Sequence, residues 1–399
     1  MHYLRGFFLV DISHRLIDIS YRRMYEELNA KNEEFEKILI KLRGDESLST
    51  KNIISVDDMT VDDIKLIFRI TMPFKEEFIH RPQKKIPILK GKSIINFFVE
   101  DSTRTKVSFE LAGKNLSADT INISKSGSSM SKKGETLNDT ARTLQSMQAD
   151  CIILRHYAAG ASRLISTQIT APVINAGDGW HEHPTQALLD AYTICDVLGT
   201  CIDKKIVIVG DILHSRVAGS LMRILTKLKA RVIISGPPTM IPVHAEEVFG
   251  VEYDPDLDHA IRDADVIYAL RIQLERAASA YIPTVREYSK RYCINMARLR
   301  LAKKDAMVMH PGPINREVDL STEVMESRQS YVEEQVTNGY ALRMALLYLL
   351  IQPTPESVDK ITKIRPSRKV LDKLQKKEKD RGNVVSSQKY FDGSAEQVY

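Results

Sequence analysis

The chain has 399 residues, of which 43% are hydrophobic and 27% are charged, the balance of an ordinary globular protein. This length predicts two or three domains and a core large enough to fold without disulfides or a structural metal. The formal net charge is +5, and the segment after Gln352 alone holds 11 basic and 7 acidic residues, so the rest of the chain is close to neutral. That distribution argues against a general nucleic-acid-binding surface.

We expect neither a membrane span nor a secretory signal among the first residues. Gly6–Val10 is apolar, but it is short, Asp11 follows it, and no small-residue cleavage site comes after it. The cysteines are scattered, without a C-x-x-C pair, at Cys151, Cys195, Cys201 and Cys293. They predict reduced thiols in a cytoplasmic protein, not a disulfide framework or a zinc site.

Two helices are expected before the first strand. Residues 20–43 are dense in charge, lack glycine and proline, and repeat apolar residues at helical spacing. We favour an amphipathic helix packed on the body of the protein, with a short coiled coil as the alternative. Gly44-Asp45 is expected to end it. The second helix is expected from Asp57 to Ile70, ending before Pro73.

Nearly continuous apolar runs then alternate with helical stretches. Such runs are typical of strands buried on both faces of a parallel sheet, and they lie at 93–99, 151–154, 173–175, 205–209, 232–235, 266–269 and 307–309. Helices are expected at about 106–115, 186–198 and 220–228, and a strongly apolar one at 338–350 should dock on the body before Pro353 ends it. This alternation predicts an α/β fold with parallel sheets.

The segment Asp101-Ser102-Thr103-Arg104-Thr105 joins an expected strand to an expected helix. Free N–H groups and the dipole at a helix start favour an anion there. The hydroxyls and the guanidinium add donors suited to phosphate. Ser102 could instead simply cap the helix, and this segment alone does not decide between the two interpretations.

This segment resembles the carbamoyl phosphate loop of the transcarbamoylases, and six further segments resemble that family in the family's own order. They are 128–136 (SSMSKKGET), 154–156 (LRH), 175–179 (NAGDG) leading into 183–186 (HPTQ), 210–218 (GDILHSRVA), 271–273 (RIQ) and 310–313 (HPGP). The resemblance covers about 53–350. Each segment is weak alone, but the ordered set is specific, and most of its members stand at strand ends, where open α/β sheets bind ligands.

The resemblance implies two domains, each a parallel sheet flanked by helices, with a C-terminal helix that crosses back to the first domain. The expected parts are an N-terminal helical extension (1–48), a carbamoyl-phosphate-binding domain (49–184), an aspartate-binding domain (185–336), a helix packing on the body (337–352) and a charged, partly disordered tail (353–399). The implied reaction is carbamoyl transfer from carbamoyl phosphate to the α-amine of L-aspartate in pyrimidine biosynthesis. It needs no metal or other cofactor, because orientation and electrostatics carry the catalysis.

The family's carbamoyl phosphate site maps onto residues of both halves of the chain. The phosphate is expected to be held by Ser102, Thr103, Arg104 and Thr105. Arg155 and His183, with help from Thr105, are expected to polarise the carbonyl oxygen, for which a neutral imidazole suffices. The carbamoyl amide is assigned to Gln186, and further contacts with carbamoyl phosphate are assigned to Gly312 and Pro313.

The family's aspartate site maps onto Arg216 and Arg271, which are expected to bind the two carboxylates, with Gln273 in support. Lys133 is also assigned to this site, and Ser129 is assigned to carbamoyl phosphate. Both are expected to reach in from a neighbouring subunit of a homotrimer with shared active sites. Several cations brought together in this way would repel one another unless they met a polyanion, and carbamoyl phosphate and aspartate together supply that charge.

Alternatives remain for the whole chain. Ornithine carbamoyltransferases share the fold and the phosphate loop, but they typically carry a cysteine beside the histidine that corresponds to His310, and a cationic substrate does not call for two arginines. Gly312 also differs from the leucine of some members. A non-catalytic scaffold that keeps the fold is the alternative of a different class.

Non-catalytic roles are also possible for single residues, and the extensions have several possible roles. Lys133 could be a solvated loop residue, and Arg271 could pair with Glu275. No catalytic role is assigned to Lys125, His156, His214 or Arg276. The extensions could contact another pyrimidine-pathway protein. A nucleic-acid partner is not expected, because the basic residues of the tail have no aromatic residues between them.

Overall fold

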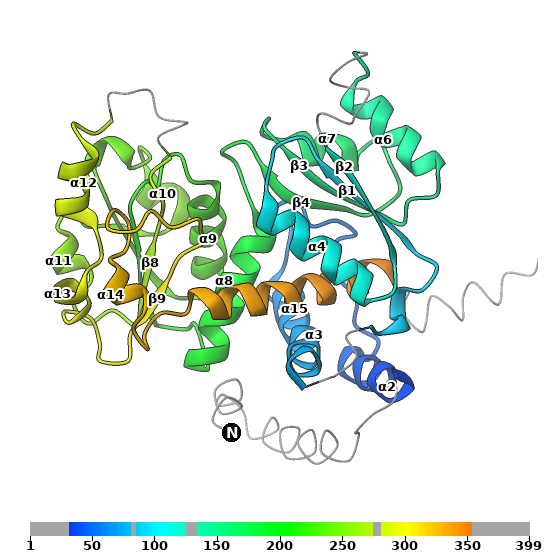
Figure 1. Cartoon of the computed structure of the whole chain (residues 1–399), viewed down its shortest axis with the longest axis horizontal. Coiled ribbons are helices and arrows are strands. Elements are labelled where there is room, and N and C mark those ends of the chain that lie inside the picture. The colour runs from blue at the N-terminus through cyan, green and yellow to red at the C-terminus, as the bar shows by residue number, and fades with distance from the viewer. Residues whose placement is uncertain (1–31, 81–84, 125–133, 274–280, 353–399) are drawn as a thin grey trace, which may run out of the picture. The chain divides into compact units, whose positions relative to one another are not determined.

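Two parallel sheets organise the fold (Figure 1). The computed structural model describes residues 32–80, 85–124, 134–273 and 281–352. The first sheet has the order β2-β1-β3-β4, and its strands are β1 (Ser93–Phe98), β2 (Asp119–Ser124), β3 (Cys151–His156) and β4 (Val173–Asp178). The second has the order β7-β6-β5-β8-β9, and its strands are β5 (Lys205–Val209), β6 (Arg231–Ser235), β7 (Glu252–Tyr253), β8 (Val266–Ala269) and β9 (Met307–Met309).

All seven expected strands are present, and the expected α/β class with parallel sheets is confirmed. Two strands, β2 and β7, were not predicted. β2 is an edge strand in which exposed and half-buried residues replace the apolar run, and β7 has only two residues. Both sheets reverse their strand order next to their first strand, between β1 and β3 and between β5 and β8. Such reversals open a space at the carboxyl ends of the strands.

Helices surround the strands. The first half of the chain contains α2 (Asn32–Arg43), α3 (Val61–His80), η1 (Pro87–Leu89), α4 (Thr103–Asn115), α6 (Leu137–Ser146), α7 (Ala161–Ser166) and α8 (Pro184–Leu198). The second half contains α9 (Arg216–Lys227), η3 (Pro238–Met240), α10 (Ala245–Phe249), α11 (Leu257–Ala260), α12 (Val285–Tyr292), α13 (Met296–Leu299), α14 (Thr322–Met325) and α15 (Val332–Ile351). None of these described helices is long and apolar enough to cross a membrane.

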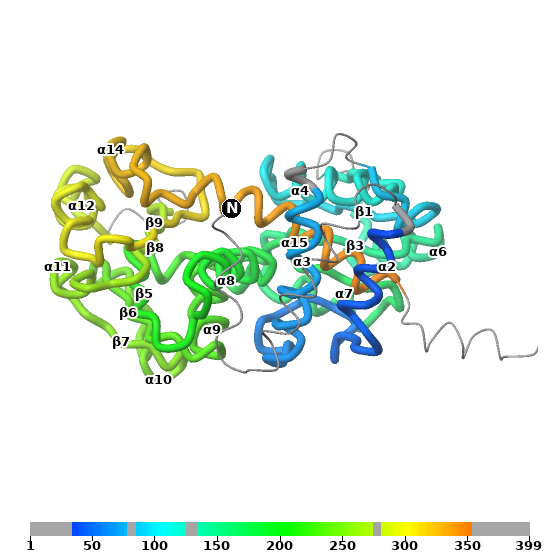
Figure 2. Tube along the Cα trace, turned by 90° about the horizontal axis from the view of Figure 1, so that it is seen from below, coloured from blue at the N-terminus to red at the C-terminus, as the bar shows by residue number. Residues whose placement is uncertain are grey.

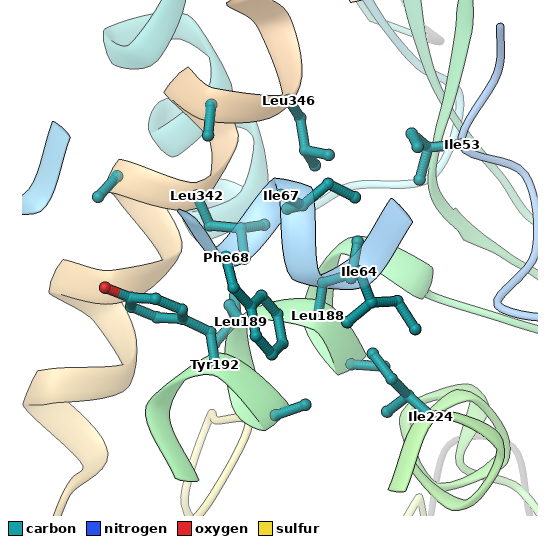
Figure 3. Packing of buried hydrophobic residues seen from close by; sticks show 14 of the residues in the cluster. Ile53, Ile64, Ile67, Phe68, Leu188, Leu189, Tyr192, Ile224, Leu342 and Leu346 are labelled. Carbon is teal, nitrogen blue, oxygen red and sulfur yellow. The ribbon is translucent and has the colours of Figure 1, made fainter. Parts of the chain in front are cut away.

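Helix α15 crosses back to the first sheet's helices, as expected. It contacts α3 and α4 as well as α8, and Figures 1 and 2 show it in orange beside them. Buried side chains fill the junction of α3, α8, α9 and α15, and Figure 3 labels among them Ile64, Phe68, Leu188, Tyr192, Ile224, Leu342 and Leu346. The Phe68 and Tyr192 rings meet edge to face with centroids 5.4 Å apart. This shared core holds α8 and α15 in place, and both helices also carry polar side chains that are described below.

The described part of the N-terminal extension packs on the body, as favoured. Phe35, Ile38 and Leu39 of α2 are buried, and Phe35 meets Phe74 of α3 with ring centroids 5.4 Å apart. The helix ends at Arg43, and the N–H of the following Gly44 donates to the Ile40 carbonyl at 2.8 Å. Expectations for residues 1–31 and for the tail at 353–399 lie outside the described residues.

The expected end of α3 before Pro73 is wrong, because the helix runs through this proline to His80. A proline inside a helix costs roughly 3 kcal/mol, since it loses a hydrogen bond and its ring crowds the preceding turn. Burial on both sides of Pro73 offsets that cost. Ile70 and Phe74 are completely buried, and the Phe74 ring also meets Tyr348 of α15 at 6.2 Å. Tertiary packing therefore decides where this helix ends.

The expectation of four reduced thiols is also wrong for two of them. Cys195 and Cys201 form a disulfide, while Cys151 and Cys293 are free and buried. The chain turns back directly after α8, where Gly199 takes a left-handed conformation, and this brings the two Cα atoms to 5.4 Å. That separation is typical of bridged cysteines. The sequence spacing hid the pair because the turn brings together residues six positions apart.

Candidate active site

The expected site residues follow the carboxyl ends of six strands. Arg104 is in the first turn of α4 after β1, and Arg155 is the second-last residue of β3. Past β4 comes His183, directly before α8, and Arg216 is the first residue of α9 after β5. The ends of β8 and β9 are followed by Arg271 and by the loop 310–313. In a parallel sheet these ends share one edge, so each sheet gathers its own candidates.

The first turn of α4 is not capped by a side-chain hydrogen bond from its N-cap residue. Ser102 occupies the N-cap position, but its side chain makes no capping hydrogen bond. Thr105 is buried, whereas Thr103 and Arg104 are exposed. Although Arg104 is open to solvent, partial desolvation by the protein around it, and then the positive charge of Arg271, lower its pKa. The two guanidinium groups therefore lie close enough to repel each other, as expected of residues built to meet an anion.

Gly312 brings the end of β9 against this same guanidinium. A Cβ atom at Gly312 would overlap the Arg104 guanidinium, and the residue has a left-handed φ of +64°. Its N–H donates to His310 Nδ1 at 2.8 Å, which holds the loop in place. A side chain at this position would have to adopt a left-handed φ and push aside the Arg104 guanidinium, which is the end of an exposed, flexible side chain.

This arrangement predicts a specific effect of Gly312→Ala. The methyl group would displace Arg104, so we expect kcat/KM for the anionic substrate of this loop to fall by roughly tenfold or more, because small misplacements at a reacting centre are costly. Gly250→Ala is the matched control: it has a φ of +66° but open space around its Cβ. Steady-state kinetics and thermal unfolding of both variants check this. Equal kinetic losses in the two variants would contradict the role of Gly312.

Arg155 and Arg216 meet at a second glycine. A Cβ atom at Gly177, whose φ is +114°, would lie 3.0 Å from Arg155 Nη1 and 3.0 Å from Arg216 Nε. Both arginines are buried, with 9% and 4% of their surfaces exposed. The NAGDG segment therefore places a glycine as the second-last residue of β4, where two guanidinium groups pack against its backbone.

Glu100, two residues after β1, contacts both of these arginines and was not predicted as a site residue. Its carboxylate accepts hydrogen bonds from Arg155 Nη2 at 3.0 Å and from Arg216 Nη1 and Nη2 at 2.9 and 2.5 Å. It thereby offsets the repulsion between two buried cations and links the end of β1 to α9. The signal was an acid between the expected strand and the hydroxyl-rich turn, but its partners are distant in sequence.

His183 lies beside these arginines. Its side chain is buried, with 4% of the residue exposed. The backbone N–H of His183 donates to Ser220 Oγ at 2.9 Å, and the ring Nδ1 lies 3.4 Å from Thr185 Oγ1. Burial, and then the charges of Arg155, Arg216 and Arg343, hold the pKa of His183 well below its ordinary value. The imidazole is therefore neutral at neutral pH, a state suited to hydrogen bonding with an oxygen and not to carrying a charge.

Arg271 and Gln273 lie in the loop that follows β8. Arg271 Nη2 donates to Gln273 Oε1 at 3.1 Å, and the Gln273 N–H donates to Asp211 Oδ2 at 3.1 Å. Asp211 follows β5, and its other oxygen lies 2.8 Å from His214 Nδ1. Asp211 therefore ties the ends of β5 and β8 together. His214 contacts this acid and His156 Nδ1 accepts from the Ala158 N–H, which agrees with structural roles for both histidines.

Gln186 stands in the first turn of α8, where its Nε2 donates to Asp190 Oδ1 at 3.1 Å. Asp190 was also not predicted. Several residues lie outside the described part of the chain, namely Lys125, Ser129, Lys133, Glu275 and Arg276, so their expected roles remain predictions. Among the described candidates, the structure forms two groups, one around Arg104, Gly312 and Arg271 and one around Arg155, Arg216 and His183.

Comparison with known proteins identifies matching families for both halves of the chain. Residues 51–196 match the domain "Aspartate/ornithine carbamoyltransferase, carbamoyl-P binding domain", and residues 202–350 match "Aspartate/ornithine carbamoyltransferase, Asp/Orn binding domain". A relative from Syntrophus aciditrophicus, named aspartate carbamoyltransferase catalytic subunit, is 52% identical over 300 residues, which cover 75% of this chain and 97% of the relative.

Solved structures show the same similarity. A crystal structure of aspartate transcarbamoylase from Trypanosoma cruzi in complex with carbamoyl aspartate and phosphate has a TM-score of 0.68 and 31% identity, covering 75% of this chain and 96% of that one. Ornithine carbamoyltransferase from Pyrococcus furiosus has a TM-score of 0.66 and 31% identity, with the same coverage. At the level of structure, the chain is about equally similar to these two proteins.

Proposed function

This chain belongs to the aspartate/ornithine carbamoyltransferase family, and we propose that it transfers the carbamoyl group of carbamoyl phosphate to the α-amine of L-aspartate. The products are N-carbamoyl-L-aspartate and phosphate, in the pyrimidine pathway. The observation that carries this proposal is the pairing of guanidinium groups: Arg155 and Arg216 pack on Gly177, and Arg104 packs on Gly312 beside Arg271. Relatives named aspartate carbamoyltransferase support the choice of acceptor.

The reaction needs positioned charge and no covalent enzyme intermediate. The amine lone pair forms a bond to the carbonyl carbon, and the carbonyl electron pair moves to the oxygen. Arg155 and neutral His183, with Thr105, stabilise that oxygen, while Arg104 stabilises the phosphate. When the tetrahedral intermediate collapses, the C–O bond to phosphate breaks, phosphate leaves with the electron pair, and the amine proton is released.

Aspartate is favoured over ornithine by the charges around its expected site. Arg216 and Arg271 suit two carboxylates, and the cationic side chain of ornithine would be repelled by them. His310 is followed by Pro311, where ornithine carbamoyltransferases typically carry a cysteine. As part of the proposal, residues 49–184 form the carbamoyl phosphate domain and 185–336 the aspartate domain. Ser129 and Lys133 complete the site of a neighbouring subunit in a homotrimer.

The acceptor assay tests this function directly. Purified protein with carbamoyl phosphate and aspartate should form carbamoyl aspartate and phosphate, and aspartate should exceed ornithine in kcat/KM by at least about a hundredfold, because like charges placed together cost several kcal/mol. Product is measured by chromatography with each acceptor in parallel, in the presence of a chelator. Equal or better use of ornithine would refute the assignment.

A further inference from the structure

Asp190 is a completely buried acid one helical turn after Gln186 on α8. Three side chains from three different elements contact its carboxyl group. Gln186 Nε2 lies 3.1 Å and Gln335 Nε2, from α15, lies 2.7 Å from Oδ1, and the Tyr268 hydroxyl, from β8, lies 2.6 Å from Oδ2. The acid therefore joins the carbamoyl side of the proposed site to both the second sheet and the C-terminal helix.

The direction of each hydrogen bond follows from a backbone group. The His310 N–H can only donate, and it donates to Gln335 Oε1 at 2.9 Å. The nitrogen of the Gln335 amide must then face Asp190, so Oδ1 must accept. Because Oδ1 of Asp190 accepts from Gln335, the Gln186 atom that contacts Oδ1 must also be a donor. The nitrogen of the Gln186 amide therefore faces Asp190.

This orientation does not depend on the charge of Asp190. Burial raises the pKa of Asp190 to about 7, while the hydrogen bonds from Tyr268, Gln335 and Gln186 and the charge of Arg343 favour ionisation. A proton taken up on Oδ2 preserves this orientation, because the Tyr268 hydroxyl can then accept from Oδ2. In both states Oδ1 accepts from the two amides.

The consequence is that the Gln186 amide oxygen stays available to a ligand, because the nitrogen and not the oxygen lies against Asp190. Among the described residues, none donates a hydrogen bond to that oxygen. A carbamoyl group ends in an NH2 that donates, whereas the methyl of an acetyl group cannot. On the basis of the proposed function, we propose that Asp190 is a positioning residue that turns the Gln186 amide oxygen toward the substrate and so selects a carbamoyl over an acetyl donor.

The same relay reaches the other side of the proposed carbamoyl site. His310, whose N–H sets the direction of the chain of hydrogen bonds, accepts on Nδ1 from the Gly312 N–H at 2.8 Å. Gln186 and the loop carrying Gly312 are therefore connected through Asp190 and Gln335. Removing the acceptor at position 190 should release Gln186 without touching the phosphate-binding residues.

Two neutral substitutions separate hydrogen bonding from charge. Asp190→Leu removes the acceptor, and Asp190→Asn keeps an Oδ1 acceptor while its Nδ2 can donate to the Tyr268 hydroxyl. The probes are carbamoyl phosphate, by its KM, and acetyl phosphate, by its inhibition constant against carbamoyl phosphate. Because an unpaired buried polar group is costly, the leucine variant should raise the KM for carbamoyl phosphate roughly 10–100-fold, with acetyl phosphate inhibition within about threefold of wild type. In the asparagine variant, the rise in the KM for carbamoyl phosphate should be several-fold smaller than in the leucine variant.

Equal weakening of both phosphates, or equal losses with leucine and asparagine, would overturn the proposal, because either result indicates a general structural or electrostatic effect. If the leucine variant does not fold, Gln335→Met breaks the chain of hydrogen bonds one step earlier. It should likewise raise the KM for carbamoyl phosphate much more than the inhibition constant of acetyl phosphate. No change in their ratio there would also overturn it. Wild-type protein that forms no carbamoyl aspartate would instead refute the proposed function, so the two failures are distinguishable.

Discussion

Arg104→Ala should lower the rate of carbamoyl transfer by at least about 10²–10³-fold, the usual cost of removing one donor that stabilises developing negative charge. Arg104 is at the start of α4, its guanidinium packs on Gly312, and it lies close enough to Arg271 for repulsion to lower its pKa. The phosphate of the substrate gains charge as it leaves, so the loss should appear in kcat as well as in KM. Steady-state kinetics with varied carbamoyl phosphate measure both.

The same substitution should leave the fold intact. Removing one of two cations that repel each other relieves strain in the free protein, so the thermal midpoint of Arg104→Ala should equal or exceed that of wild type. Arg231→Ala serves as a control, because Arg231 is more than half exposed and pairs only with Glu252 among the described residues. A near-normal rate in Arg104→Ala would mean that this arginine merely begins a helix.

Lys133→Ala should be nearly inactive, with an expected loss again of about 10²–10³-fold or more. Lys133 lies outside the described residues, and its role comes from the resemblance of its loop to the one that transcarbamoylases lend to a neighbouring subunit. Lys132→Ala, next to it in the same loop, is the matched control and should keep most of the activity. Equal losses for the two lysines would indicate a general effect of charge in place of a specific contact.

Most of the strand framework could be predicted because strands of a parallel sheet are buried on both faces and therefore read as apolar runs. β2 escaped because it is an exposed edge strand, and β7 because two residues carry no pattern. The passage of α3 through Pro73 and the pairing of Cys195 with Cys201 depend on tertiary packing and on a turn. Rules based on local sequence predict neither feature, because both depend on contacts formed only in the folded chain.

The site divides in a similar way. Its cations were predicted, because a family motif marks each of them at a strand end. Glu100 was missed because its partner Arg216 is 116 residues away, and Asp190 because Gln335 is 145 residues away. Glu100 and Asp190 contact candidate site residues that are distant in sequence, and only the folded chain brings these partners together.

We propose that the described arginines form a carbamoyltransferase site that a neighbouring subunit completes. Mixing tests it most directly: Arg104→Ala and Lys133→Ala proteins, each poorly active, are dissociated together, reassembled, and confirmed as hybrids by mass. If sites are shared, about one quarter of the interfaces in an equal mixture pair an intact Arg104 with a neighbour's intact Lys133. Activity should return to about that fraction of reassembled wild type, whereas verified hybrids that remain inactive would contradict the claim.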